Sequence, residues 1–155
     1  MDEERINITA PLAEPTSFLI LVRSVEEQWR AGLLIESLRA FGGRLSSCPV
    51  WVFLRDPASA SCTYPGIEDE DVHSIPLVIE DEFRHYFFAD KVHACAQAEE
   101  MAVQEGVHSL VWMSPNGLIV NPPVLFDFAP SFDAALRPVH IKNVGLLAGE
   151  PLNDF

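Results

Sequence analysis

The sequence has few basic residues and no long apolar run, and both absences limit what the chain can do. Only 10 Lys and Arg stand against 23 Asp and Glu, for a formal net charge of -13. Nucleic-acid binding depends on clustered Lys and Arg that displace counterions, so we expect no nucleic-acid partner. An anionic membrane surface is disfavoured for the same reason. An anionic small ligand stays compatible with this charge, because a helix N-terminus and a few local basic groups can hold it.

The sequence also lacks targeting and membrane signals. No stretch reaches the roughly 18 apolar residues that a membrane span needs, so we expect no membrane insertion. The first residues, Met1-Asp-Glu-Glu-Arg5, are acidic and polar, whereas a secretory signal starts basic and then turns apolar. These features favour a cytoplasmic location.

Cysteine is scarce. The chain has 3 cysteines, Cys48, Cys62 and Cys95, without C-x-x-C spacing, so we expect neither a disulfide framework nor a structural zinc site. His93 and Cys95 are two residues apart, which places them on different faces of a helix. The acidic run 68–71 offers oxygen ligands for hard cations, but a solvated loop is the more common reason for such a run. We therefore predict no metal site from these residues.

Familiar catalytic motifs are absent. The sequence contains no G-x-G-x-x-G, no G-x-x-x-x-G-K-[ST], no G-x-S-x-G and no H-E-x-x-H. These patterns mark dinucleotide sites, P-loops, nucleophile elbows and zinc proteases, so nothing in the sequence favours those four classes.

The remaining pattern predicts one α/β domain at residues 17–155, after an irregular lead-in at 1–16. With 48% hydrophobic residues, the chain has enough apolar material for one core. The first elements are a buried strand at 17–23, a helix from a capping box at Ser24 and Glu27 to about Phe41, and a strand at 49–55. This order is a βαβ unit, which favours a parallel pair of strands.

The second half continues the alternation of strands and helices. The further predicted elements are a loop at 56–70, a strand at 72–80, a helix at 89–105, a strand at 109–113, a short return strand at 118–120, an apolar stretch at 124–128 and a last strand at 136–141; 81–88 gets no assignment. The predicted fold is a three-layer α/β/α domain with a mostly parallel central sheet. Apolar spacing predicts that the first helix buries Trp29, Leu33, Leu34, Leu38 and Phe41, and that Trp29, Trp51 and Trp112 belong to the core.

A polar tetrad, Ser114-Pro115-Asn116-Gly117, follows the strand at 109–113. Open α/β sheets bind ligands at the carboxyl ends of their strands, so the tetrad is a candidate ligand site. It is also an ordinary turn sequence, because Pro suits the second position of a turn and Asn-Gly tolerates positive φ. The tetrad can therefore be a working site, the remnant of one, or a turn alone.

The segment Val111-Trp-Met-Ser-Pro-Asn-Gly-Leu-Ile-Val120 resembles the region of the Asp-x-Asp motif in nucleotide-diphospho-sugar transferases, the GT-A glycosyltransferase architecture. Ser114 and Asn116 stand where that degenerate motif would have its two Asp residues. The helix beginning Ala89-Asp-Lys-Val-His-Ala94 fits the helix before the motif, and 137–145 resembles a later strand. The layout is similar over 17–147.

This resemblance implies a GT-A-like fold and a nucleotide-sugar donor. In the family, the two acids hold Mn²⁺ or Mg²⁺, which neutralises the leaving diphosphate. Ser and Asn carry no charge and bind such ions far more weakly. The resemblance thus predicts a glycosyltransferase-like, sugar-nucleotide-binding domain with weak or lost metal-dependent transfer, and Mn²⁺ or Mg²⁺ has a role only if the site is active.

The resemblance also gives a set of candidate donor contacts, and no residue is assigned as a catalytic base. The candidates are Arg23, Ser24, Arg55, Lys91, Ser114 and Asn116. Each has a structural alternative: Ser24 as a helix cap, Arg23 and Arg55 as solvent-facing strand ends, Lys91 as a surface residue.

Two other interpretations of the whole chain stay open. The first is a non-catalytic interaction or assembly domain on the same fold, for example a homo-oligomer joined through Phe87, Phe88, Phe126 and Phe128. The second is a portion of a longer enzyme.

Overall fold

The computed structural model describes residues 12, 15–55, 70–86, 88–127 and 134. Most of the predicted lead-in and of the 56–70 loop, and the whole predicted strand 136–141, lie outside these residues.

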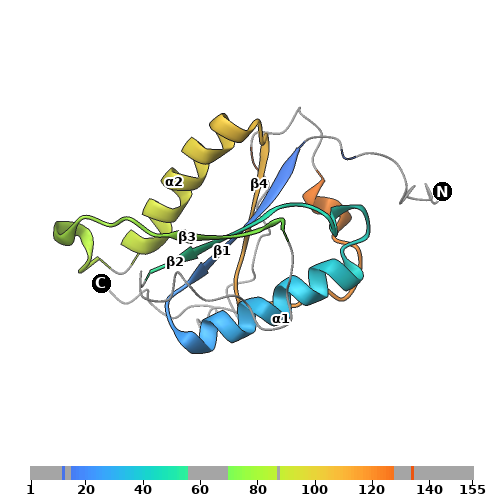
Figure 1. Cartoon of the computed structure of the whole chain (residues 1–155), viewed down its shortest axis with the longest axis horizontal. Helices are drawn as coiled ribbons and strands as arrows, with labels where there is room; N and C mark the ends of the chain where they lie inside the picture. The colour runs from blue at the N-terminus through green and yellow to red at the C-terminus, as the bar shows by residue number, and fades with distance from the viewer. Residues whose placement is uncertain (1–11, 13–14, 56–69, 87, 128–133, 135–155) are drawn as a thin grey trace, which may run out of the picture.

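The described residues form one small α/β unit (Figure 1). In chain order its main elements are β1 (Thr16–Val22), α1 (Val25–Phe41), β2 (Val50–Leu54), β3 (Val72–Pro76), α2 (Ala89–Glu105) and β4 (Ser109–Met113). The same described residues also include three short 3₁₀ helices, at Gly43–Leu45, Asp81–Phe83 and Val124–Phe126. The bounds of both long helices and of β4 agree with the prediction.

The sheet has the strand order β3-β2-β1-β4, and all three of its strand pairs are parallel. From β1 the chain passes through α1 to β2 on one side, and from β3 it passes through α2 to β4 on the other side of β1. The direction of winding therefore changes between β1 and β4. The two helices lie on opposite faces of the sheet (Figure 1), which confirms the predicted α/β class with helices on both faces.

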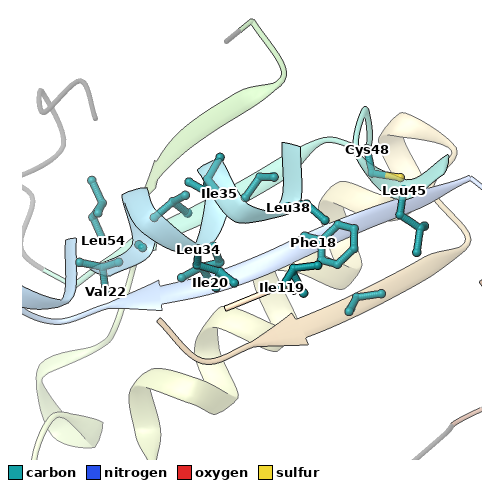
Figure 2. Close-up of a cluster of buried hydrophobic side chains, with 14 residues drawn as sticks. Phe18, Ile20, Val22, Leu34, Ile35, Leu38, Leu45, Cys48, Leu54 and Ile119 are labelled. Carbon is teal, nitrogen blue, oxygen red and sulfur yellow. The ribbon is translucent and has the colours of Figure 1, made fainter. Parts of the chain in front are cut away.

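The core is divided by the sheet into two clusters because side chains of a strand alternate between its faces. Phe18, Ile20 and Val22 of β1 pack toward α1, as Figure 2 shows for that cluster. Leu19 and Leu21 pack toward α2. All seven residues of β1 are buried, which is why its sequence from Phe18 to Val22 is an uninterrupted apolar run rather than an alternating one.

The residues that flank α1 determine both of its ends. The Ser24 hydroxyl accepts a hydrogen bond from the Glu27 N–H at 3.2 Å, and the Glu27 carboxylate accepts one from the Arg23 N–H at 2.7 Å. A Ser cap of this kind contributes about 1 kcal/mol. At the other end, a Cβ on Gly42 would lie 2.4 Å from the Leu38 carbonyl oxygen, so only glycine fits there.

The predicted buried face of α1 is partly wrong. Leu34 and Leu38 are buried, but Trp29 is 63% and Phe41 52% exposed, and Leu33 is also exposed. The face against the sheet instead uses Gln28, Ala31, Leu34, Ile35 and Leu38. The reason is that α1 is apolar on both sides, so spacing alone cannot tell which side meets the sheet. Of the other two tryptophans, Trp51 is fully buried, as predicted, and Trp112 is half-buried against the α2-side cluster.

α2 meets the sheet through a row of alanines. Ala94, Ala98 and Ala102 are spaced one turn apart and are all buried against Leu19, Leu21 and Trp51. Because alanine has only a Cβ, the helix backbone lies close to the strands. The helix ends at Gly106, whose φ of 68° lies in the left-handed region, with its N–H bonded to the Ala102 carbonyl.

Two predicted strand assignments differ from the structure. Residues 118–120 do not form a strand: the Ile119 N–H donates to the Ser37 hydroxyl at 2.9 Å, so this segment follows α1 rather than another strand. Ile119 is buried, whereas Leu118 and Val120 are exposed. β3 ends at Pro76 instead of reaching residue 80, since the Leu77 N–H makes one last bond to Leu54 and the chain then leaves the sheet.

We expect Trp51 to stabilise the fold through its buried apolar ring and not through a hydrogen bond of its indole N–H. It is 0% exposed, and its indole N–H has no hydrogen-bond partner among the described residues. Trp51→Ala should lower the free energy of unfolding by about 3–5 kcal/mol through the cavity that it leaves. Trp51→Phe should cost clearly less than Trp51→Ala, because it leaves a smaller cavity and also removes an unsatisfied donor. Urea unfolding followed by circular dichroism measures both; equal losses would contradict this account.

Candidate functional site

A pocket of about 320 Å³ lies at the carboxyl ends of β1 and β2, beneath the start of α2. It is lined by Arg23, Arg55, Ile79, Arg84, His85, Tyr86, Ala89 and Asp90. Arg23 directly follows β1, Arg55 directly follows β2, and Asp90 belongs to the first turn of α2. Three arginines thus meet in one hollow of a chain whose net charge is -13.

Arg23 and Asp90 form the best-defined contact of the pocket. The Arg23 Nε and Nη2 atoms donate to the two carboxylate oxygens of Asp90, with 3.3 Å between Nη2 and Oδ1. The Asp90 side chain is only 7% exposed, and its Oδ1 also accepts the Lys91 N–H at 2.8 Å. This two-pronged pair joins the end of β1 to the start of α2 across 67 residues of sequence.

The ion pair controls the protonation of both partners. Burial raises the pKa of Asp90, but the hydrogen bonds and charge of Arg23, the Lys91 N–H and the charge of Arg55 together lower it below its ordinary value. The hydrogen bond that Arg23 donates to Asp90 raises the pKa of Arg23 in turn, against the smaller effect of burial. Asp90 is therefore ionised, and Arg23 is charged, at neutral pH.

The other cationic groups of the pocket are more exposed. Arg55 is exposed, and no hydrogen bond or ion pair joins its side chain to another described residue. Arg84 is exposed and pairs at 2.9 Å with Asp81, which is itself 96% exposed. Next to Arg84, the rings of His85 and Tyr86 lie 4.1 Å apart. Asp90 is thus bonded to Arg23 and is within electrostatic reach of Arg55, while Arg84 lines the same pocket. Guanidinium groups gathered in this way match the oxygen atoms of an anion.

The structure brings two of the six sequence-predicted residues into the pocket lining, Arg23 and Arg55. Ser24 is the cap of α1, as its structural alternative proposed. Lys91 lies beside the pocket, with its Nζ 6.0 Å from the centre of the Trp112 ring. Sequence reasoning missed Arg84, His85 and Tyr86, because 81–88 had no periodicity; the signal available was the cluster of cationic and aromatic side chains just before α2.

The tetrad forms a turn and does not line the pocket. The Gly117 N–H donates to the Ser114 carbonyl at 3.0 Å, and the Asn116 N–H approaches the Ser114 hydroxyl at 3.4 Å. The Asn116 Oδ1 accepts a hydrogen bond of 2.6 Å from Arg30 Nη1 of α1. The use of Ser114 and Asn116 as ligand contacts stays a prediction.

These residues do not fit Mn²⁺ or Mg²⁺. A hard cation needs anionic oxygens, whereas Ser114 and Asn116 are neutral and the guanidinium of Arg30 is bonded to the Asn116 oxygen that would have to coordinate the ion. Elsewhere in the described ranges, no three His, Cys, Asp or Glu side chains gather closely enough to hold a metal ion. Among the helices of the described residues, none has the length and apolar character to cross a bilayer.

The predicted phenylalanine patch is not one surface. Phe88 is 61% exposed at the start of α2, but Phe126 is half-buried and packs edge-to-face on Phe18, with ring centres 6.3 Å apart, in the α1-side core. Phe87 and Phe128 lie outside the described residues. The inclusion of Phe126 was therefore wrong, because its ring fills the core beside β1.

Comparisons of the chain with protein-family models, with curated proteins and with solved structures found no match.

We expect Asp90→Asn to destabilise the protein in a pH-dependent manner. A carboxylate with a lowered pKa stabilises the fold above its ordinary pKa, and this contribution is lost as the pH falls through the folded-state pKa. Because Arg23 is 35% exposed, we expect a loss of about 1–3 kcal/mol at pH 7, less than for a fully buried pair. Urea unfolding between pH 7 and pH 3 measures this.

The difference between wild type and Asp90→Asn should shrink at the acidic end of that range. The matched control is Asp81→Asn, which removes an exposed partner of Arg84 and should change stability little. A loss for Asp90→Asn that is constant with pH would show that packing, not charge, explains the effect.

Proposed function

We propose that this chain is a glycosyltransferase-like domain that binds a nucleotide sugar, on a GT-A-like fold, with weak or lost metal-dependent transfer. The observation that carries the proposal is the arginine-lined pocket at the carboxyl ends of β1 and β2. Open parallel sheets bind ligands outside the carboxyl ends of their strands, next to the point where winding reverses. The pocket adjoins that point, because β1 has β2 on one side and β4, which the chain reaches from β3 through α2, on the other.

The chemistry of the pocket supports an anionic ligand with a ring. Guanidinium groups match phosphate oxygens in a planar fork, and an exposed tyrosine ring offers a surface for a base or sugar. The volume of about 320 Å³ is at the small end of ligand sites, so it accommodates part of a nucleotide sugar and leaves the remainder outside. A cytoplasmic location, where such donors are made and used, belongs to the same proposal.

Loss of metal-dependent transfer is supported by the tetrad. A metal-held diphosphate would need two acids after β4, where the chain has Ser114 and Asn116, with Arg30 already bonded to Asn116. A divalent ion at that point would meet a fixed positive charge. We name no catalytic base.

Titration calorimetry with UDP- and GDP-sugars tests the proposal. We expect at least one of them to bind with a Kd of about 1 mM or tighter, and the corresponding free sugar to give no heat, because the phosphates provide the charge that the arginines contact. If none of the nucleotide sugars gives heat on titration, the proposal is wrong.

A second candidate function, an assembly domain, is supported by the outward face of α1. Val25, Trp29 and Leu33 lie one above the other at a spacing of four residues and are 76%, 63% and 37% exposed. A helix that is apolar on both sides is usually covered on both sides. A second copy of this chain would bury these side chains and form a homo-oligomer.

Sedimentation velocity over a range of protein concentrations tests the second candidate. We expect the wild type to associate as concentration rises and Trp29→Lys to stay monomeric, because a charge in an apolar interface lacks a partner. The control is Val103→Lys, which changes an 85% exposed apolar residue of α2 and should leave association intact. A wild type that is monomeric at every concentration would exclude this function.

A further inference from the structure

We infer that a diphosphate held by this protein is neutralised by the side chains of Arg55 and Arg84, without a divalent ion. This inference rests on the proposed function and names the part of the donor that the pocket binds. It differs from the expectation that the resemblance gives, in which the diphosphate lies on a metal ion after β4.

The start of α2 contributes little to such an anion site. A helix N-terminus binds anions through free backbone N–H groups. Here the Ala89 N–H bonds to the Tyr86 carbonyl at 3.1 Å, the Lys91 N–H to the Asp90 carboxylate at 2.8 Å, and the Val92 N–H to the Phe88 carbonyl at 3.1 Å. Because these three donors are already used, contacts to an anion come mainly from side chains.

Arg23 has a structural role in the pocket and is not the main contact for the ligand. Two of its nitrogens bond to Asp90, and its Nη1 lies 4.0 Å from the Glu27 carboxylate. Two acids therefore compensate its single charge. Arg23 lines the pocket between the end of β1 and the start of α2, and its charge offsets that of the buried Asp90.

Arg55 and Arg84 are the guanidinium groups of the pocket that no buried carboxylate bonds, although the charge of Arg55 acts on Asp90. Arg55 makes no side-chain ion pair within the described residues, and the partner of Arg84, Asp81, is almost fully exposed. An exposed pair of this kind contributes little free energy and is readily exchanged for a phosphate. The two guanidinium groups come from different segments, the end of β2 and the chain before α2, so they line the pocket together only in the folded protein.

The turn after β4 is a less favourable binding site for the diphosphate than the arginine pocket. Neither Ser114 nor Asn116 lines the pocket, and their neighbouring cation, Arg30, is bonded to both Asn116 and Glu26. Neutralisation by the pocket arginines is thus the arrangement that uses the charges present in this chain.

Calorimetry with UDP and with inorganic pyrophosphate, first in EDTA and then with Mn²⁺, tests the inference. We expect both probes to bind in EDTA, and Mn²⁺ to make neither bind more tightly. Arg55→Gln and Arg84→Gln should each weaken binding roughly tenfold to a hundredfold, the usual effect of losing a charge-assisted hydrogen bond. Circular dichroism and thermal melts verify that the variants fold.

Two control variants separate the pocket from the turn. Arg30→Gln removes an arginine of similar exposure next to Asn116, and Asn116→Ala removes the amide itself. Both should leave binding in EDTA within roughly twofold of wild type, because neither residue contacts the pocket. Arg55→Lys should recover part of the loss of Arg55→Gln, since lysine keeps the charge but not the fork.

The outcomes also separate this inference from the proposed function. If nucleotide sugars bind only with Mn²⁺, or if Arg55→Gln and Arg84→Gln bind as tightly as wild type, the arginine site is wrong while nucleotide-sugar binding stands. If pyrophosphate binds in an Arg55-dependent way and no nucleotide sugar does, the arginine site stands and the proposed function falls. If no probe binds in EDTA, the inference is overturned.

Discussion

The ion pair between Arg23 and Asp90 is the constraint on which the candidate site depends. The end of β1 and the start of α2 are 67 residues apart in sequence, and a side-chain ion pair joins them directly. The pair does so through a buried carboxylate with both oxygens bonded. Burying this charge would be costly without Arg23, and the position of Arg23 is itself fixed by its backbone bond to Glu27. The pocket is thus a product of helix capping at α1 and charge pairing at α2.

Much of the fold could be predicted from local chemistry. The capping residues Ser24 and Glu27, and the glycines after each long helix, determine helix ends through backbone geometry that needs no tertiary information. The uninterrupted apolar run of β1 identifies a strand covered on both faces. The face of α1 could not be predicted, because residues on both of its sides are apolar and only the sheet decides between them. The path of residues 118–120 depends on the hydrogen bond of Ile119 to Ser37, 82 residues away, and on the burial of Ile119 in the α1-side core.

The candidate site was predictable only where a side chain directly follows a strand. Arg23 and Arg55 meet that condition, and parallel strands bring their carboxyl ends to the same edge. Arg84, His85 and Tyr86 precede a helix in a segment without periodicity, so their place depends on how the chain returns to α2. The sequence of the tetrad is compatible with both a turn and a ligand site. The structure shows a turn whose amide is held by Arg30, a partner that no local pattern identifies.

The alanine row on α2 has a consequence for how the pocket can change. Ala94, Ala98 and Ala102 set the distance between α2 and the sheet, and the pocket lies at the same end of α2 as Ala94. A single added methylene group at these positions would move the helix outward and widen the cavity without altering any residue that lines it. The width of the pocket is therefore adjustable through the core.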